Sequence, residues 1–273
     1  HLSHLIFRAG LVPLLGALSF AALLRAKRLQ RGWLLVGLLT GLTLYTYVAA
    51  RVYVGYLLLW LIWWAIRDTN IRRGTLQAIA VIALLSLPLL VALQQPTQTT
   101  ATIERAAAEN IETVWDNTLK WGNALLGAGD PNDDHNLPER AILDLPLAAL
   151  AFVGLLGGWH IVRERWLMAW WLGLLLVTLA PTILSIDAPH YLRGVGLILP
   201  LVLLIGAGAA WLSRWRYGWV LSTALLLWAA INTAADFTRW LETAELGIYI
   251  DERVNRALAD VDILSDGQKR LVV

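Results

Sequence analysis

Four polar side chains recur at helical spacing near the end of one apolar stretch. Thr40, Thr43, Tyr47 and Arg51 are separated by three or four residues, a spacing that predicts one stripe along a helix. A guanidinium stays charged and binds phosphate oxygens in a bidentate manner. Arg51, with Tyr47 one turn deeper, therefore has the chemistry of a phosphate clamp at a membrane interface. The alternative is that Arg51 only extends its charged head towards water beside an interfacial tyrosine.

The densest polar cluster between two apolar stretches contains Asp187, His190, Tyr191 and Arg193. One interpretation is that His190 and Arg193 join Arg51 around an anionic lipid headgroup. The other is that Asp187 caps the next helix and Arg193 anchors it. The residue types do not decide between these two interpretations.

A third polar segment contains Asp130, Asp133, Asp134 and His135. Carboxylates and an imidazole are ligands for divalent cations, but these residues lack the regular spacing of a metal-binding helix. We expect a solvated acidic turn here, with no metal and no cofactor. The chain also has no cysteine, and it lacks the P-loop, GxGxxG, GxSxG and HExxH patterns.

Composition identifies the elements that must position these residues. Apolar residues make up 58% of the 273 positions and the mean hydropathy is +0.60, more than a water-soluble core requires. About 20 apolar residues cross a bilayer. We predict an all-α integral membrane protein of about eight transmembrane helices. The apolar stretches are 5–24, 33–50, 53–66, 75–93, 145–162, 167–184, 194–212 and 219–235.

Charge is sorted along this pattern. With eight spans, all four basic clusters fall on one side, which the positive-inside rule makes cytoplasmic; they are Arg25, Lys27, Arg28 and Arg31, then Arg67, Arg72 and Arg73, then Arg163 and Arg165, then Arg214 and Arg216. Stretches 33–50 and 53–66 are separated only by Arg51 and Val52, so they could form one long helix, but that merger would scatter the clusters over both sides. Because the formal net charge is only +2, the basic residues indicate topology rather than nucleic-acid binding.

The predicted organisation has four parts. Residues 1–93 contain helices one to four, 94–144 form an extracytoplasmic loop, 145–235 contain helices five to eight, and 236–273 form an extracytoplasmic tail. The loop has nine acidic and three basic residues, and the tail has eight acidic and five basic residues. Apolar residues recur at helical spacing from Ile103 to Leu125, which predicts an amphipathic helix on the membrane surface. We expect a multi-pass protein of the inner (plasma) membrane.

Three outward-facing stretches resemble the bacterial relatives of the dolichyl-phosphate-mannose protein mannosyltransferases, which belong to the GT-C glycosyltransferases. They are residues 41–47 with Arg51, residues 129–138 with 143–144, and residues 189–193 with Gly196 and Pro200. Their order and spacing are similar to those of the C-terminal two-thirds of such an enzyme. Relatives commonly have glycine and proline where this chain has Glu139 and Ala141.

The resemblance implies transfer of a sugar from a polyprenyl-phosphate donor to an acceptor, with inversion, at the outer face of the membrane. In that case Arg51 and Arg193 contact the phosphate, and Tyr47, His190 and Tyr191 shape the pocket. Asp130, His135 and Asn136 help to fold a loop over the sugar, and the catalytic acid is expected upstream of His1. The partners implied are the lipid-linked sugar and membrane lipids.

Two other function classes remain open at this point. The chain could be a non-catalytic, glycosyltransferase-like subunit of a larger membrane complex. A transporter is less favoured, because transporters usually show repeated halves and polar breaks at the bilayer midplane, and neither is evident here.

Overall fold

The structure is a computed structural model that describes residues 2–93, 111–131, 137–162, 165–185 and 188–243. These residues form α-helices and one short 3-10 helix, and they contain no β-strand. The helices are α1 (Leu2–Leu29), α2 (Trp33–Thr43), α3 (Ala50–Arg67), α4 (Arg72–Leu93), α6 (Ile111–Leu126), α7 (Leu145–Ile161), α8 (Arg165–Ile183), η1 (Val195–Leu197), α9 (Ile198–Leu212) and α10 (Gly218–Thr243). The expected all-α fold is thus confirmed for the described part of the chain.

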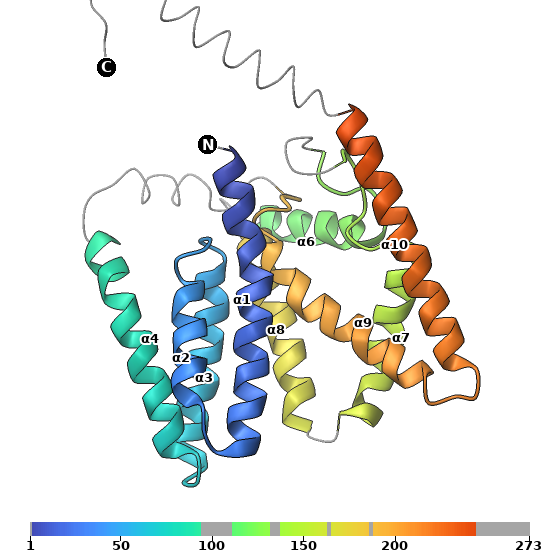
Figure 1. The fold of residues 1–273 in the computed structure, drawn as a ribbon. Coiled ribbons are helices and arrows are strands. Elements are labelled where there is room, and N and C mark those ends of the chain that lie inside the picture. The colour runs from blue at the N-terminus through green and yellow to red at the C-terminus, as the bar shows by residue number, and fades with distance from the viewer. Residues whose placement is uncertain (1, 94–110, 132–136, 163–164, 186–187, 244–273) are drawn as a thin grey trace, which may run out of the picture.

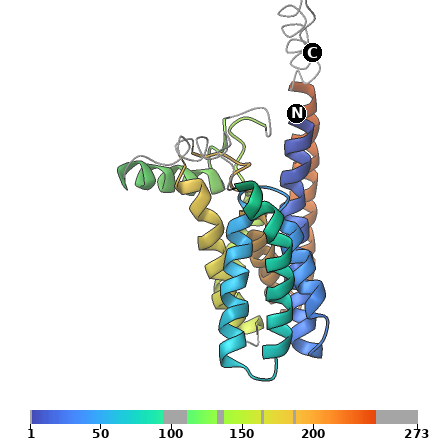
Figure 2. The same ribbon diagram turned by 90° about the vertical axis from the view of Figure 1, so that its left-hand side faces the viewer.

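All the long helices except α6 run up and down the molecule, and consecutive ones alternate in direction (Figure 1). The turns after α1, α3 and α9 lie at one end, shown at the bottom, and they carry the basic clusters around Arg28, Arg72 and Arg214. The turn between α2 and α3, the segment after α6 and the connection from α8 to η1 lie towards the other end. Helix α6 crosses that end and projects beyond the bundle (Figures 1 and 2). We call this end of the bundle the α6 end.

By length and composition, five described helices can cross a membrane, namely α1, α4, α8, α9 with η1, and α10. Helices α2 and α7 are apolar but shorter. Large apolar side chains are exposed on α3, α4, α8 and α10; Ile66, Leu84, Leu176 and Ile231 are each at least 66% exposed. A soluble monomer rarely exposes so much apolar surface, so lipid is the solvent that this surface fits.

The connection between α2 and α3 corrects the predicted polar stripe. Helix α2 ends at Thr43 and α3 begins at Ala50, so Tyr47 and Arg51 do not continue the helical face of Thr40 and Thr43. The N–H groups of Leu44, Tyr45 and Thr46 each donate to the carbonyl three residues earlier, and the Thr46 hydroxyl donates to the Thr43 carbonyl at 2.7 Å. Hydroxyls that occupy backbone carbonyls in this way favour helix ends over helix interiors. The turn also excludes a single merged helix.

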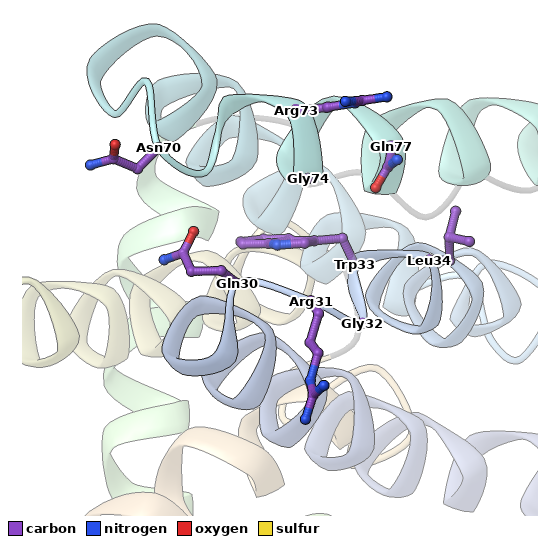
Figure 3. A pocket seen from close by; sticks show the side chains of 9 residues that line it. All are labelled: Gln30, Arg31, Gly32, Trp33, Leu34, Asn70, Arg73, Gly74 and Gln77. Carbon is purple, nitrogen blue, oxygen red and sulfur yellow. The ribbon is translucent and has the colours of Figure 1, made fainter.

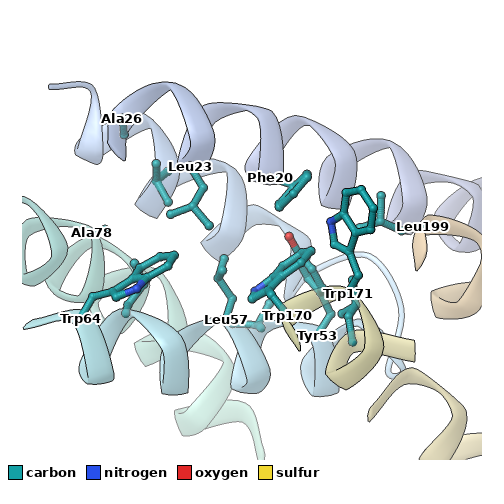
Figure 4. Close-up of a cluster of buried hydrophobic side chains, with 14 of the residues drawn as sticks. Phe20, Leu23, Ala26, Tyr53, Leu57, Trp64, Ala78, Trp170, Trp171 and Leu199 are labelled. Carbon is teal, nitrogen blue, oxygen red and sulfur yellow. The ribbon is translucent and has the colours of Figure 1, made fainter. Parts of the chain in front are cut away.

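The main apolar core joins α1, α3, α4 and α8 (Figure 4). Phe20 stacks on Trp170 with ring centroids 4.4 Å apart. The phenol of Tyr53 is buried beside them, bonded to the Ser19 hydroxyl at 2.5 Å and donating to the Gly16 carbonyl at 3.1 Å. A buried hydroxyl with two partners costs little to desolvate, so this pair fixes α3 against α1.

A second core joins α7 and α9, whose backbones approach each other closely. A Cβ on Gly154 would lie 1.9 Å from the Leu204 carbonyl oxygen, and a Cβ on Gly208 would lie 1.9 Å from the Leu150 carbonyl oxygen. Small residues permit this contact between membrane helices. Gly208 makes this contact, whereas a Cβ on the nearby Gly206 would meet open space.

Candidate site at the α6 end

The buried face of α6 packs across the end of α8. The Asn117 side-chain amide donates to the Ile183 carbonyl at 3.0 Å and also to the Ser185 carbonyl. One turn later, Trp121 is 2% exposed. The expected amphipathic helix is present over residues 111–126; its predicted earlier turns, from Ile103, lie outside the described residues.

The segment after α6 meets the segment after α8 through Asp130 and Tyr191. Asp130 is 3% exposed, and its carboxylate accepts a hydrogen bond of 2.8 Å from the backbone N–H of Tyr191. The Tyr191 hydroxyl donates to the Arg140 carbonyl. The ring centroids of Tyr191 and Trp121 are 6.1 Å apart. Asp130 thus belongs to a buried, hydrogen-bonded contact rather than to a solvated turn.

Two glycines allow these segments to approach each other. A Cβ on Gly129 would lie 1.8 Å from the Tyr191 hydroxyl oxygen, and a Cβ on Gly194 would lie 2.3 Å from the Trp121 ring. Either methyl group would displace an aromatic side chain that is held by neighbours. The glycines are therefore required by close packing at these two points.

The loop that follows Asp130 is closed by backbone pairs. The Gly129 N–H donates to the Glu139 carbonyl and the Glu139 N–H donates to the Asp130 carbonyl, both at 3.0 Å. Glu139 has a φ of 60°, which lies in the left-handed region that favours glycine. Asp144 then caps α7 by accepting a hydrogen bond of 3.1 Å from the Leu147 N–H.

Helix α10 continues past its predicted end at residue 235 to Thr243, and its last turns contact this loop. Arg140 Nε lies 2.8 Å from the Asp236 carboxylate, and the Arg140 guanidinium also donates to the Thr233 hydroxyl at 3.4 Å. The first residues of the predicted tail thus contact the predicted loop. The remainder of the tail, from residue 244, lies outside the described residues.

The turn between α2 and α3 also packs against the connection between α8 and η1. Tyr47 and Leu192 pack against a small core of Val12, Ala50 and Val195. Tyr47 also lies within electrostatic range of the Arg193 guanidinium. This contact brings the stretch that carries Arg51 next to the stretch that carries Arg193, as phosphate binding by both would require.

Arg51 and His190 hold specific positions around this contact. Arg51 is on the first turn of α3, half-buried, and its Nε makes no hydrogen bond to any described residue. The His190 carbonyl accepts hydrogen bonds from the N–H groups of Arg193 and Gly194, at 3.1 and 3.2 Å. This turn sets the direction of the chain into η1 and α9.

The sequence-predicted residues are thus partly assembled. The structure brings Asp130 to Tyr191 and Tyr47 to Arg193, whereas Asp187, His135 and Asn136 lie outside the described residues. Sequence reasoning missed Asn117, Trp121 and Arg140. An asparagine four residues before a tryptophan on the apolar side of an amphipathic helix was the available signal for the first two.

Tyr191 is the group at this site with a strongly shifted pKa. Burial raises its pKa to about 12, because desolvation disfavours the phenolate. At neutral pH the hydroxyl is therefore a hydrogen-bond donor. In the described part of the chain, no three His, Asp or Glu side chains are grouped so as to hold a metal ion.

The chain matches no protein-family model, no curated protein and no solved structure. A function must therefore be argued from the physical features of the site.

Proposed function

We propose that the chain is part of a membrane glycosyltransferase that transfers a sugar from a polyprenyl-phosphate donor to an acceptor at the α6 end. The observation that supports the proposal best is a convergence. The three stretches that resemble GT-C enzymes are far apart in the sequence, and the third lies in the connection between α8 and α9. Asp130 of the second stretch accepts a hydrogen bond from Tyr191 in this connection, and Tyr47 of the first packs against a core that includes Val195.

In this proposal α1 to α4 and α7 to α10 form eight spans, and the basic end faces the cytoplasm. The short helices α2 and α7 fit this arrangement because the bundle alternates in direction through both (Figure 1). The α6 end then lies at the extracytoplasmic interface, where the phosphate of a lipid-linked donor is exposed. Helix α6, with Trp115 and Leu119 exposed on its surface, lies in the headgroup region.

The basic side chains at the α6 end have roles that follow from their chemistry. Transfer of the sugar releases a lipid phosphate, so negative charge develops on the leaving oxygen. Arg51 and Arg193 stabilise that charge, because fixed cations in a poorly solvated site act more strongly than in water. Arg51 also lies on the first turn of α3, where the helix dipole adds favourable potential for an anion.

Asp130 and the two tyrosines hold this arrangement together. The carboxylate of Asp130 fixes the backbone of Tyr191, and the Tyr191 phenol fixes the loop at Arg140. Tyr47 and Leu192 pack against the same small core, which joins the α2–α3 turn to the connection between α8 and η1. These residues position the segment that carries His190 and Arg193.

The test is sugar transfer by the intact protein in membranes supplied with a radiolabelled polyprenyl-phosphate sugar. Arg51→Ala and Arg193→Ala are each expected to lower the rate by about 100-fold, the size of effect seen when one group that stabilises a developing oxyanion is removed. Arg214→Ala, at the opposite end, is the matched control and should retain the rate.

Transfer that is unchanged in both arginine variants would refute the assigned site. An intact protein that folds and transfers no sugar from any such donor would instead favour the non-catalytic subunit of a larger membrane complex. Folding is checked in each case by the thermal unfolding midpoint of the purified protein.

A further inference from the structure

A polar pocket and an apolar pocket lie outside the contacts described above. The polar pocket has a volume of about 400 Å³ and lies at the basic end, beside the turn between α1 and α2. Its two arginines, Arg31 and Arg73, extend to opposite sides, with Trp33 and Gly74 between them (Figure 3). The polar pocket therefore brings no pair of cations to one ligand.

The apolar pocket lies on the surface of α3 and has a volume of about 350 Å³. Its lining consists of four residues of that helix, Tyr56, Leu59, Trp60 and Trp63. Side chains four residues apart form rows along a helix, with a groove between neighbouring rows. Leu59 and Trp63 belong to one row, and Tyr56 and Trp60 belong to the next, so the pocket is part of such a groove. We call it the α3 groove.

One wall of the α3 groove is held by α8. The Tyr56 hydroxyl donates to the Trp170 carbonyl at 2.9 Å, and the ring centroids of Trp60 and Trp166 are 6.1 Å apart. The other wall is exposed. Trp63 is 46% exposed, and its ring meets that of Trp60 edge-on, with centroids 5.3 Å apart. The groove thus has one fixed wall and is open on its other side.

The same two rows lead from the pocket to the start of α3. The exposed row continues through Gly55 to Arg51, and the other row continues to Val52. Gly55 is exposed, and a Cβ there would meet no atom within 4 Å. Long side chains of a helix also lean towards its N-terminus, so Leu59 borders the surface beside Gly55. No side chain of the exposed row therefore interrupts the groove between Leu59 and Arg51.

The α3 groove is cationic at its head and apolar along its length. Arg51 is half-buried, and its Nε makes no hydrogen bond to any described residue. The helix rises about 18 Å between Arg51 and Trp63. Grooves of this kind admit one row of side chains from a packed helix, so they also fit a single hydrocarbon chain. A lipid with a phosphate at its end matches both features, whereas an apolar partner helix would leave the charge of Arg51 without an anion.

We propose that the α3 groove binds the polyprenyl chain of the lipid-phosphate donor, with the phosphate beside Arg51. This inference rests on the proposed function, because it assigns a place to the chain of the same donor. Methyl branches of the chain pack between Leu59 and Trp63, and its double bonds lie against the indole rings of Trp60 and Trp63. A straight, saturated acyl chain has neither feature, so the groove favours an isoprenoid.

The test measures binding of radiolabelled undecaprenyl phosphate to the intact protein in phosphatidylcholine nanodiscs. Gly55→Phe should bind at least about tenfold more weakly, because the added ring fills the groove between Arg51 and Leu59. Gly206→Phe is the matched control, since Gly206 is also exposed on an apolar helix and a Cβ there would meet no atom within 4 Å. This control, and Gly55→Ala with its single added methyl group, should stay within about twofold of the unchanged protein.

The unfolding midpoint verifies that each variant folds. If Gly55→Phe does not fold, Gly55→Leu tests the same block, with Gly206→Leu as its control. Unchanged binding in a folded Gly55 variant with the larger side chain, or equal weakening in its Gly206 control, would overturn the groove.

Competition distinguishes an isoprenoid chain from a phospholipid. Unlabelled undecaprenyl phosphate should displace the probe, whereas phosphatidic acid at the same concentration should not. Equal displacement by phosphatidic acid would overturn the assignment to an isoprenoid. Failure of the proposed function has a different signature, because the intact protein would then bind undecaprenyl phosphate with the same dependence on Gly55 and transfer no sugar.

Discussion

The Asp130 carboxylate accepts a hydrogen bond of 2.8 Å from the Tyr191 backbone N–H, although the two residues are 61 positions apart. This contact joins the segment after α6 to the segment after α8. It is the most direct link between two stretches that the sequence suggested only separately. This contact, its neighbours and the arrangement of the helices lead to five testable predictions.

Asp130→Ala should destabilise the α6 end. The change leaves the Tyr191 N–H without this acceptor, and a lost hydrogen bond to a charged group costs about 1.5–3 kcal/mol. Asp130→Asn, which keeps a side-chain oxygen, should lose less. The measurement is the thermal unfolding midpoint in detergent, with Asp116→Asn on the exposed face of α6 as control. Equal midpoints for Asp130→Ala and the control would contradict the role of the contact.

Gly194→Ala should also destabilise the protein, because the added Cβ would lie 2.3 Å from the buried Trp121 ring. Overpacking of this kind costs about 1–3 kcal/mol. Gly122→Ala is the matched control, since Gly122 is next to Trp121 in α6 and has open space around it. In a helix interior alanine is favoured over glycine by about 1 kcal/mol, so this control should raise the midpoint. A Gly194→Ala protein as stable as the control would show that the contact yields easily.

Glu139→Gly should stabilise the loop. Glu139 has a φ of 60°, and a left-handed conformation costs a residue with a side chain about 1 kcal/mol more than glycine. The backbone pairs with Gly129 and Asp130 should remain. The measurement is the unfolding midpoint together with the rate of limited proteolysis in the loop. Glu112→Gly, in the regular geometry of α6, should have the opposite sign.

Stability should fall at high pH in a way that depends on Tyr191. Its pKa is about 12 in the folded protein, against about 10 for an unfolded tyrosine. The folded state therefore holds the proton more tightly, so the stabilisation is complete below pH 10 and is lost as the pH rises towards 12. The Tyr191→Phe protein should show a smaller loss of unfolding midpoint between these pH values. Parallel curves for the two proteins would argue against a buried, donating phenol.

Labelling of single cysteines should reveal the topology, since the chain contains no cysteine of its own. Val48→Cys and Glu112→Cys lie towards the α6 end, and Thr69→Cys and Tyr217→Cys lie at the basic end; all four positions are exposed. In intact cells a membrane-impermeant maleimide should label the first pair and leave the second pair unlabelled. Labelling of Val48→Cys and Thr69→Cys from the same side would refute separate spans for α2 and α3.

The sequence by itself determined the solvent and the element type. Its apolar content, its run lengths and the placement of arginine between the runs require lipid-facing helices, because these signals are local and add up along the chain. They also located the turns that carry basic residues. The turns after α1, α3 and α9 lie at one end of the molecule, and residues 163–164 lie outside the described residues. Residue type alone made Arg51, Tyr191 and Arg193 candidate site residues.

Only the tertiary structure decided which of these side chains meet. Helical spacing placed Tyr47 and Arg51 in one stripe, but hydroxyl-to-carbonyl bonds end α2 at Thr43 and turn the chain. Asp130 was predicted to be a solvated acid, yet it is buried and accepts a hydrogen bond from the Tyr191 N–H, 61 residues away. Contacts of this kind depend on how whole helices pack, and no local pattern of residues records that packing.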